Sequence, residues 1–183
     1  NQYKELLWTW NKSINLVSET TLKDFETRHV LDCLQLLNYL PNTGEKILDM
    51  GSGAGLPGLL LAIAGIKNIT LAETNQKKVD FLQEAVRELQ LDVRILCQRL
   101  EKIDENFTFF VSRSCAPLER LLEYMNDMYI PEQSRGLFHK GENVKMEINQ
   151  AQKNWSFDYI FHPSQTHSKG VILEIFSINR RKA

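Results

Sequence analysis

Apolar residues follow two different spacings along the chain, and the change of spacing predicts the order of helices and strands. Over residues 25–40 they recur every three or four positions, which predicts an amphipathic helix, and residues 2–10 carry a similar pattern. From residue 46 onward, short apolar runs at 46–50, 68–73, 92–97, 107–112 and 135–140 predict strands. Helical segments at 57–64, 76–89, 117–128 and 142–152 lie between most of them. The chain is therefore predicted to be helical before residue 46 and alternating after it.

Strands and helices that alternate with short connections predict a doubly wound α/β sheet of mostly parallel strands. Two β-rich segments, 155–162 and 171–177, have no helix between them and should form an antiparallel hairpin at the sheet edge. The 183 residues, 43% of them hydrophobic, suffice for one core. We expect a single domain over 1–183, with a helical cap at 1–44 and the α/β core at 45–183.

Composition narrows the function classes. Lys and Arg number 22 against 23 Asp and Glu, and this near-neutral balance argues against a globally basic nucleic-acid binder but leaves room for a local basic patch. The three cysteines are far apart and lack C-x-x-C spacing, which favours free thiols in a reducing compartment over a metal site. No run approaches the roughly 20 apolar residues of a membrane helix, and no signal-peptide pattern is present. These features predict a soluble cytoplasmic protein.

The strand at 46–50 carries Asp49 near its end and leads into a turn with four glycines, at positions 51, 53, 55 and 58. Glycine permits positive φ and leaves no Cβ between the main chain and a ligand. Pro57 suits the first turn of the following helix, where its missing N–H is not needed. A strand, a glycine turn and a helix start can bind a phosphate at the helix dipole or a nucleoside packed against the glycines.

Two templates compete for this turn. Residues 53–58 satisfy the dinucleotide pattern G-x-G-x-x-G, and Glu73 lies 20 residues after Gly53, where a ribose-binding acid belongs. An acid, one residue and then G-x-G-x-G, as in the segment that starts at Asp49, is typical of Rossmann-like S-adenosylmethionine-dependent methyltransferases, in which an acid at the strand end can face a cationic ligand. The second pattern favours a methyltransferase over an NAD-dependent oxidoreductase. Two alternatives remain: the turn binds no ligand, and Glu73 caps the helix that follows it.

Five motifs extend the match beyond the turn. They are Asn15-Leu16-Val17-Ser18, Arg28-His29-Val30-Leu31-Asp32-Cys33-Leu34, the glycine segment 49–58, Ser112-Arg113-Ser114 and Lys140-Gly141. In their order and spacing the chain resembles, from about residue 8 onward, the bacterial family of small-subunit rRNA guanine-N7 methyltransferases, also called glucose-inhibited division protein B. The resemblance implies a class I methyltransferase with a seven-stranded, mostly parallel sheet and an N-terminal helical cap. It also implies S-adenosylmethionine as methyl donor and small-subunit rRNA or the small ribosomal subunit as partner. We expect the protein to be a monomer.

The same resemblance implies roles for individual residues. The amino-acid and ribose end of the cofactor would lie on Gly51, Gly53, Gly55 and Leu56, its ribose hydroxyls on Glu73, and its adenine near Leu100 and Glu101. Arg113 would lie near the methionine end. A basic cluster would face the RNA and serve the reaction, made of Lys77, Arg99, Arg113 and Lys140. Asn15 and His29 would belong to the cap over the pocket.

Guanine N7 carries its own lone pair, so its methylation needs no general base, and alignment with exclusion of water supplies most of the acceleration. The chain accordingly has neither an N-P-P-[YF] motif nor a Pro-Cys nucleophile pair. Two purely structural interpretations remain. The basic residues could form surface ion pairs, and His29 could be a partly buried histidine whose ring nitrogens have hydrogen-bond partners in the protein. A non-catalytic RNA-binding assembly factor that keeps the fold is the remaining alternative.

Overall fold

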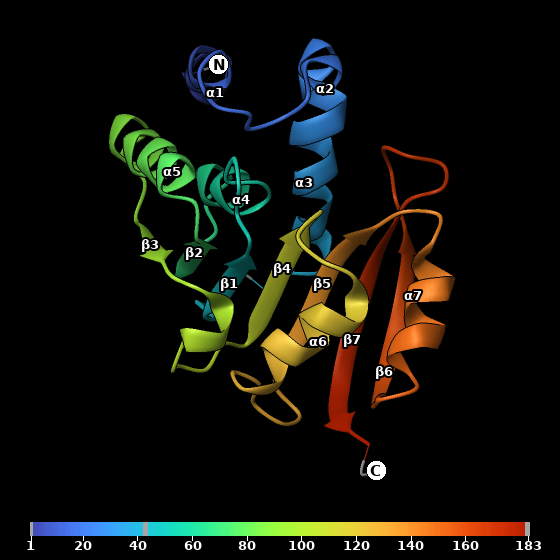
Figure 1. The fold of residues 1–183 in the computed structure, drawn as a ribbon. Coiled ribbons are helices and arrows are strands. Elements are labelled where there is room, and N and C mark those ends of the chain that lie inside the picture. The colour runs from blue at the N-terminus through green and yellow to red at the C-terminus, as the bar shows by residue number, and fades with distance from the viewer. Residues whose placement is uncertain (1, 42–43, 182–183) are drawn as a thin grey trace.

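The computed structural model describes residues 2–41 and 44–181. In this part of the chain seven strands form one sheet, in the order β3-β2-β1-β4-β5-β7-β6 (Figure 1). Their bounds are β1 (Ile47–Met50), β2 (Ile69–Glu73), β3 (Val93–Cys97), β4 (Phe109–Arg113), β5 (Arg135–Lys140), β6 (Trp155–Pro163) and β7 (Val171–Arg180). The predicted strands are confirmed, with β7 extending beyond its expected end.

Strands β1 to β5 run parallel to one another, whereas β7 runs antiparallel to both β5 and β6. Every residue of β1 and β2 is buried, as expected for strands covered on both faces. The predicted doubly wound sheet with an antiparallel edge hairpin is therefore confirmed. Because β7 lies between β5 and β6, the order differs from the 3-2-1-4-5-6 of dinucleotide-binding folds.

Helices cover both faces of the sheet. One cluster of buried residues joins the sheet to α4 (Gly58–Ile63) and α5 (Gln76–Glu88), and a second joins it to α6 (Leu118–Asn126) and α7 (Val144–Ala151). Short turns of helix complete the core, including η3 (Leu100–Lys102) after β3. Helix α4 begins at Gly58, with Pro57 as its cap residue, one position after the predicted start.

The N-terminal segment contains α1 (Gln2–Asn11), α2 (Glu19–Lys23), η1 (Glu26–Leu31), α3 (Asp32–Leu34) and η2 (Gln35–Asn38). The predicted helix over 25–40 is confirmed in position, since residues 26–38 are helical without a break, but its winding changes from π-helical to α-helical to 3₁₀. The carbonyls of Arg28 and Asp32 accept hydrogen bonds from Arg113 and His139 at the ends of β4 and β5. These contacts tie the irregularly wound segment to the sheet, and π-helical turns are frequent at functional sites.

In Figure 1, α1 and α2 lie beyond the carboxyl ends of the parallel strands, and α3 continues from α2 toward the sheet. Tyr3, Leu7, Phe25 and Leu36 are buried in the same cluster as α4 and α5. The Tyr3 hydroxyl also donates to the carbonyl of Ala54 at 2.6 Å. The N-terminal helices thus share a core with the sheet, while the boundary between cap and core stays a prediction. Within residues 2–41 and 44–181, every helix is too short or too polar to cross a membrane.

Candidate active site

The glycine turn begins where β1 ends, and three of its glycines have positive φ: Gly51 at 70°, Gly53 at 56° and Gly55 at 80°. A Cβ on Gly51 would lie 2.5 Å from Cys115 Sγ, and one on Gly55 would collide with Leu59. A Cβ on Gly53 would meet nothing nearer than the Gly51 carbonyl oxygen at 3.9 Å. Packing therefore requires glycine at 51 and 55, whereas at Gly53 the missing side chain leaves open space.

Asp49 lies beneath this turn. It is fully buried, and its Oδ2 accepts a hydrogen bond of 2.9 Å from the N–H of Gly58 at the start of α4. Its Oδ1 has no partner among the described residues, and burial raises the pKa of the carboxyl to about 7. The expectation that Asp49 faces the ligand is corrected: the side chain holds the turn from below, outside the cavity wall.

Replacing Asp49 with asparagine should change how stability depends on pH. Between about pH 4 and 7 the native state keeps a proton on Asp49 that the unfolded chain has lost, so this carboxyl lowers stability as pH rises. His29 acts oppositely, because its native pKa of about 4 lies below the 6.5 of an unperturbed histidine, and stability is lost as pH falls through that window. The two effects offset each other in the wild-type chain.

In Asp49→Asn the offset is gone, so the free energy of unfolding should rise more steeply between pH 4 and 6.5 than in the wild type. Urea unfolding at a series of pH values measures this slope. The exposed Asp80, which accepts a hydrogen bond from Gln76, supplies the matched control Asp80→Asn. Equal slopes for Asp49→Asn and the wild type would contradict the assignment.

Glu73 connects the end of β2 to the turn. Its Oε2 accepts from the Gly53 N–H at 2.9 Å, and its Oε1 accepts from the N–H groups of Thr74 and Asn75. Asn75 is the N-cap of α5, since its side chain accepts from Lys77 and Lys78, so the alternative role of Glu73 as the cap is wrong. A carboxylate has about four lone-pair positions, which leaves Glu73 capacity for a further donor.

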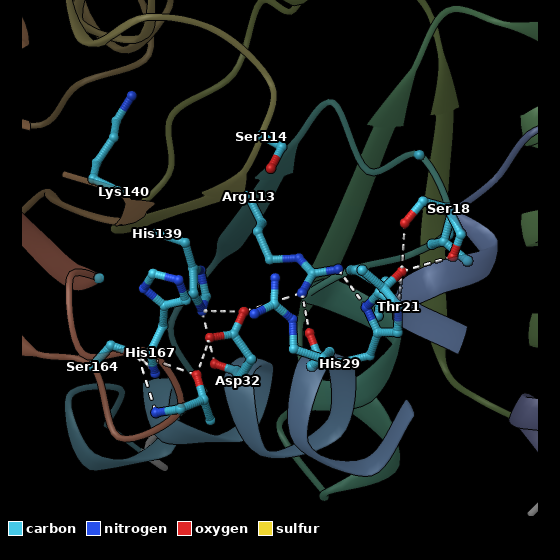
Figure 2. A pocket seen from close by; sticks show the side chains of 18 of the residues that line it. Ser18, Thr21, His29, Asp32, Arg113, Ser114, His139, Lys140, Ser164 and His167 are labelled. Atoms are coloured by element: carbon cyan, nitrogen blue, oxygen red, sulfur yellow. Dashed lines mark hydrogen bonds and ion pairs between the residues drawn. The ribbon is translucent and has the colours of Figure 1, made fainter. Parts of the chain in front are cut away.

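A cavity of about 560 Å³ lies over the turn (Figure 2). Its wall comes from the glycine turn, the N-terminal helices with the segment between α1 and α2, the start of α5, the ends of β4 and β5, and the loop between β6 and β7. The predicted residues in this wall are Gly51, Gly53, Leu56, Arg113, Lys140 and His29.

Arg113 and Asp32 form the central ion pair of this wall. The Arg113 Nη1 lies 3.0 Å from Asp32 Oδ2 and donates to the carbonyl of Arg28 at 2.8 Å. Asp32 Oδ1 accepts from the hydroxyl of Thr166 at 2.6 Å, so one carboxylate joins the N-terminal helices, β4 and the β6–β7 loop. Figure 2 shows Arg113 and Asp32 directed toward one another. Burial raises the pKa of Asp32, but the His139 ring when protonated, the hydrogen bonds from Thr166 and Arg113 and the charge of Arg113 together hold that pKa below its usual value.

His29 is buried, and both ring nitrogens have partners. Its Nδ1 accepts from Arg113 Nη2 at 2.7 Å, because a guanidinium can only donate, and its Nε2 then donates to Thr21 Oγ1 at 3.0 Å. Burial and the neighbouring Arg113 lower the pKa of His29 to about 4, so it is neutral near pH 7. The structural interpretation of His29, a histidine with hydrogen-bond partners in the protein, is confirmed, although the residue also lines the cavity.

Lys140 is also committed to the protein. Its Nζ donates to Glu147 Oε2 at 2.7 Å and to the carbonyl of Ala116 at 3.0 Å, and only 7% of its side chain is exposed. Lys140 therefore fits the structural interpretation of the basic residues, in which they form ion pairs within the protein. Its stem still lines the cavity and a second cavity of about 350 Å³ beside it.

Eight predicted residues lie outside the cavity wall as the described residues define it: Asp49, Glu73, Lys77, Arg99, Gly55, Leu100, Glu101 and Asn15. Lys77 and Arg99 are exposed, and Lys78, not Lys77, lines the cavity. Glu101 pairs with Arg120 at 2.6 Å on the surface. The basic cluster is thus not brought together at one place.

Sequence reasoning missed three wall residues with clear contacts: Asp32, His139 and Thr166. Asp32 closes the R-H-x-L-D motif, so that spacing could have pointed to it. The other two carry no local signal, because their contacts depend on how β5 and the β6–β7 loop approach the N-terminal helices.

Comparison with known proteins gives matches in sequence and in fold. A family model described as rRNA small subunit methyltransferase G matches residues 1–176. The ribosomal RNA small subunit methyltransferases G of Rickettsia prowazekii and Rickettsia felis are 38% and 36% identical over 178 residues, which are 97% of this chain and 92% of theirs.

Solved methyltransferases share the fold at low identity. A ribosomal protein L11 methylase from Lactobacillus delbrueckii superposes with a TM-score of 0.63 and 15% identity, over 88% of this chain and 80% of that one. The glycopeptide N-methyltransferase MtfA, in complex with S-adenosylhomocysteine, gives 0.66 and 10%, over 80% and 89%. The predicted class I methyltransferase fold is therefore confirmed.

Proposed function

Because this chain belongs to the rRNA small subunit methyltransferase G family, we propose that it transfers the methyl group of S-adenosylmethionine to N7 of a guanine in small-subunit rRNA. The observation that carries the proposal is the extent of the match. It covers residues 1–176 and thus includes the glycine turn, the N-terminal helices and the loop that together enclose the cavity.

The residues around the turn fit the cofactor. The open space at Gly53, where a Cβ would project, suits a ligand lying directly on the main chain. Gly51, Gly53 and Leu56 would support its amino-acid and ribose end, Glu73 its ribose hydroxyls, and Arg113 would lie near its methionine end. We retain Leu100 and Glu101 as neighbours of the adenine, since η3 follows the strand beside β2. When bound, S-adenosylmethionine would supply an electrophilic methyl group on its sulfonium sulfur.

The protein's contribution is alignment and exclusion of water, since N7 already carries a lone pair. Arg113 supports both by fastening the N-terminal helices over the turn through Asp32 and the Arg28 carbonyl. Because Arg113 and Lys140 are engaged inside the protein, the exposed Lys77 and Arg99 are better placed to neutralise RNA phosphates. The resemblance predicts one basic cluster that faces the RNA; we propose instead that only the two exposed residues do so.

Two alternatives differ from the proposal in measurable ways. The sheet order argues against an NAD-dependent oxidoreductase, because β7 is inserted where the dinucleotide fold has none. A non-catalytic assembly factor would bind the small subunit without transferring a methyl group. We further propose that the enzyme acts as a monomer, and in the cytoplasm, where small ribosomal subunits are assembled.

Calorimetry and methyl transfer test the function together. We expect S-adenosylhomocysteine to bind with one site per chain and NAD to show no binding heat. We also expect labelled methyl groups from S-adenosylmethionine to appear in small subunits or their rRNA, but not in free guanosine. Binding of NAD in place of S-adenosylhomocysteine would favour the oxidoreductase, and cofactor binding without transfer to either RNA substrate would favour the assembly factor.

A further inference from the structure

The second cavity, of about 350 Å³, adjoins the one over the glycine turn and shares part of its wall. The shared residues end β4 and β5 or follow them directly: Ser114, His139, Lys140 and Gly141. The rest of the wall comes from β4, the segment that leads into α6, α6 itself and Glu147 on α7. Pockets for small ligands occupy roughly 300–1,000 Å³, so this space is large enough for one nucleobase. A base in it would lie beside the proposed cofactor site.

Glu147 supplies the one carboxylate in the wall of this second cavity, as the described residues define it. Its Oε2 accepts two hydrogen bonds of 2.7 Å, one from Lys140 Nζ and one from the N–H of Leu118 at the start of α6. Its Oε1 accepts no hydrogen bond within residues 2–41 and 44–181, and 27% of the side chain is exposed. The protein thus fixes one oxygen of the carboxylate and leaves the other as an acceptor for a ligand.

Guanine carries the donors that suit such an acceptor. Its N1–H and its N2 amine are neighbours on the Watson–Crick edge, and one carboxylate oxygen has two lone pairs and can accept from both. Adenine presents a lone pair at N1 and only a C–H at C2, so it would be repelled by a carboxylate. Enzymes that modify a base commonly take it out of the stack and read its Watson–Crick edge in a pocket. A carboxylate in this cavity therefore distinguishes the two purines.

We propose that the target guanine lies in the second cavity and that Glu147 Oε1 accepts from its N1–H and N2 amine, so that guanine is selected over adenine. The inference rests on the proposed function. N7 lies on the edge adjacent to the Watson–Crick edge, so a base that presents N1–H to Glu147 can present N7 to the neighbouring cofactor site. Lys140 and the N–H of Leu118 hold the carboxylate in position for this contact.

The contact also becomes stronger during the reaction. N7 gains the methyl group through its own lone pair, the electron pair of the broken sulfur–methyl bond stays on sulfur, and the base becomes cationic without losing a proton. A cationic ring makes N1–H a stronger donor, and a carboxylate beside it stabilises the developing charge. Loss of the carboxylate should therefore lower kcat as well as raise KM for the RNA.

Glu147→Gln separates recognition from structure. The amide oxygen can still accept from Lys140 and Leu118, and because both of these groups only donate, the amide NH2 takes the place of Oε1. A donor then faces the donors of guanine. Glu142→Gln is the matched control, since Glu142 precedes α7 and pairs with Lys169 on the surface. Methyl transfer to small subunits, calorimetry with S-adenosylhomocysteine and thermal unfolding are measured for both variants.

We expect Glu147→Gln to lower kcat/KM for the RNA roughly 10- to 100-fold, with part of the loss in kcat. Its affinity for S-adenosylhomocysteine and its melting temperature should stay close to those of the wild type, and Glu142→Gln should match the wild type throughout. Wild-type rates in Glu147→Gln would show that the carboxylate serves the fold alone and would overturn the inference. A loss of S-adenosylhomocysteine affinity that matches the loss of activity would overturn it too.

A change in the RNA gives a second test that does not depend on how a variant folds. Inosine in place of the methylated guanosine lacks the N2 amine but keeps N1–H and N7. With small subunits assembled on such an rRNA, we expect the wild-type rate to fall roughly tenfold, and the difference between the two RNAs to shrink in Glu147→Gln. Equal wild-type rates on both RNAs, or the same difference in both proteins, would contradict the contact. If the wild-type protein methylates no guanine, the proposed function itself is wrong.

Discussion

Replacing Arg113 with alanine is expected to reduce methyl transfer by about 100-fold or more and to lower the free energy of unfolding by roughly 3 kcal/mol. The guanidinium is 16% exposed and makes three contacts with the N-terminal helices, to Asp32, the Arg28 carbonyl and His29. Its removal leaves the Asp32 carboxylate, 19% exposed, without its Arg113 partner. The helices that cover the turn then lose their attachment to β4, and both stability and alignment suffer.

Arg113→Lys separates charge from geometry, because a lysine can pair with Asp32 but cannot reach all three partners at once. We expect a partial recovery of stability and a smaller recovery of activity. Arg87→Ala is the matched control, since Arg87 also pairs with carboxylates, Glu84 and Glu88, but on the exposed face of α5. Activity assays and urea unfolding report both quantities. Wild-type activity and stability in Arg113→Ala would contradict the assigned role.

Replacing Gly53 with alanine is expected to weaken S-adenosylhomocysteine binding at least about tenfold while lowering stability by only about 1–2 kcal/mol. Its φ is 56°, and the new Cβ would enter the cavity without meeting protein atoms closer than 3.9 Å. The substitution should therefore weaken ligand binding more than it lowers the stability of the fold. Calorimetry and urea unfolding measure the two effects.

Two other glycines serve as controls for Gly53→Ala. Gly65 has a φ of 100° with nothing within 4 Å of a Cβ, so Gly65→Ala imposes backbone strain without touching the cavity. Gly51→Ala should damage folding more, because its Cβ would lie 2.5 Å from Cys115 Sγ. If Gly53→Ala bound S-adenosylhomocysteine as tightly as Gly65→Ala does, the ligand would not lie on Gly53.

The fold was predictable from the sequence because its strands are short apolar runs and its helices have a clear period. The edge hairpin followed from the missing helix between the last two strands, and β6 and β7 confirm it. The irregular winding over residues 26–38 was not predictable in this way. The carbonyls of this segment accept hydrogen bonds from Arg113 and His139, which lie more than 80 residues away in the sequence, and such contacts leave no local pattern.

The candidate site was predictable in part. Gly51, Gly53 and Leu56 line the cavity because the turn that contains them is a local structure. Asp49 was assigned to the ligand because sequence shows that an acid ends the strand, but burial beneath the turn is a property of packing. His139 and Thr166 meet Asp32 only through the register of β5 and the β6–β7 loop, so neither could be found from local spacing.

The position of the transferred methyl group tests the central claim most directly. Small subunits that lack the modification are incubated with the protein and labelled S-adenosylmethionine, and the rRNA is then reduced with borohydride and treated with aniline, which cleaves at N7-methylguanine. We predict label at one guanine of the small-subunit rRNA and strand cleavage at that nucleotide. Label on another atom or another base, or no label at all, would contradict the account.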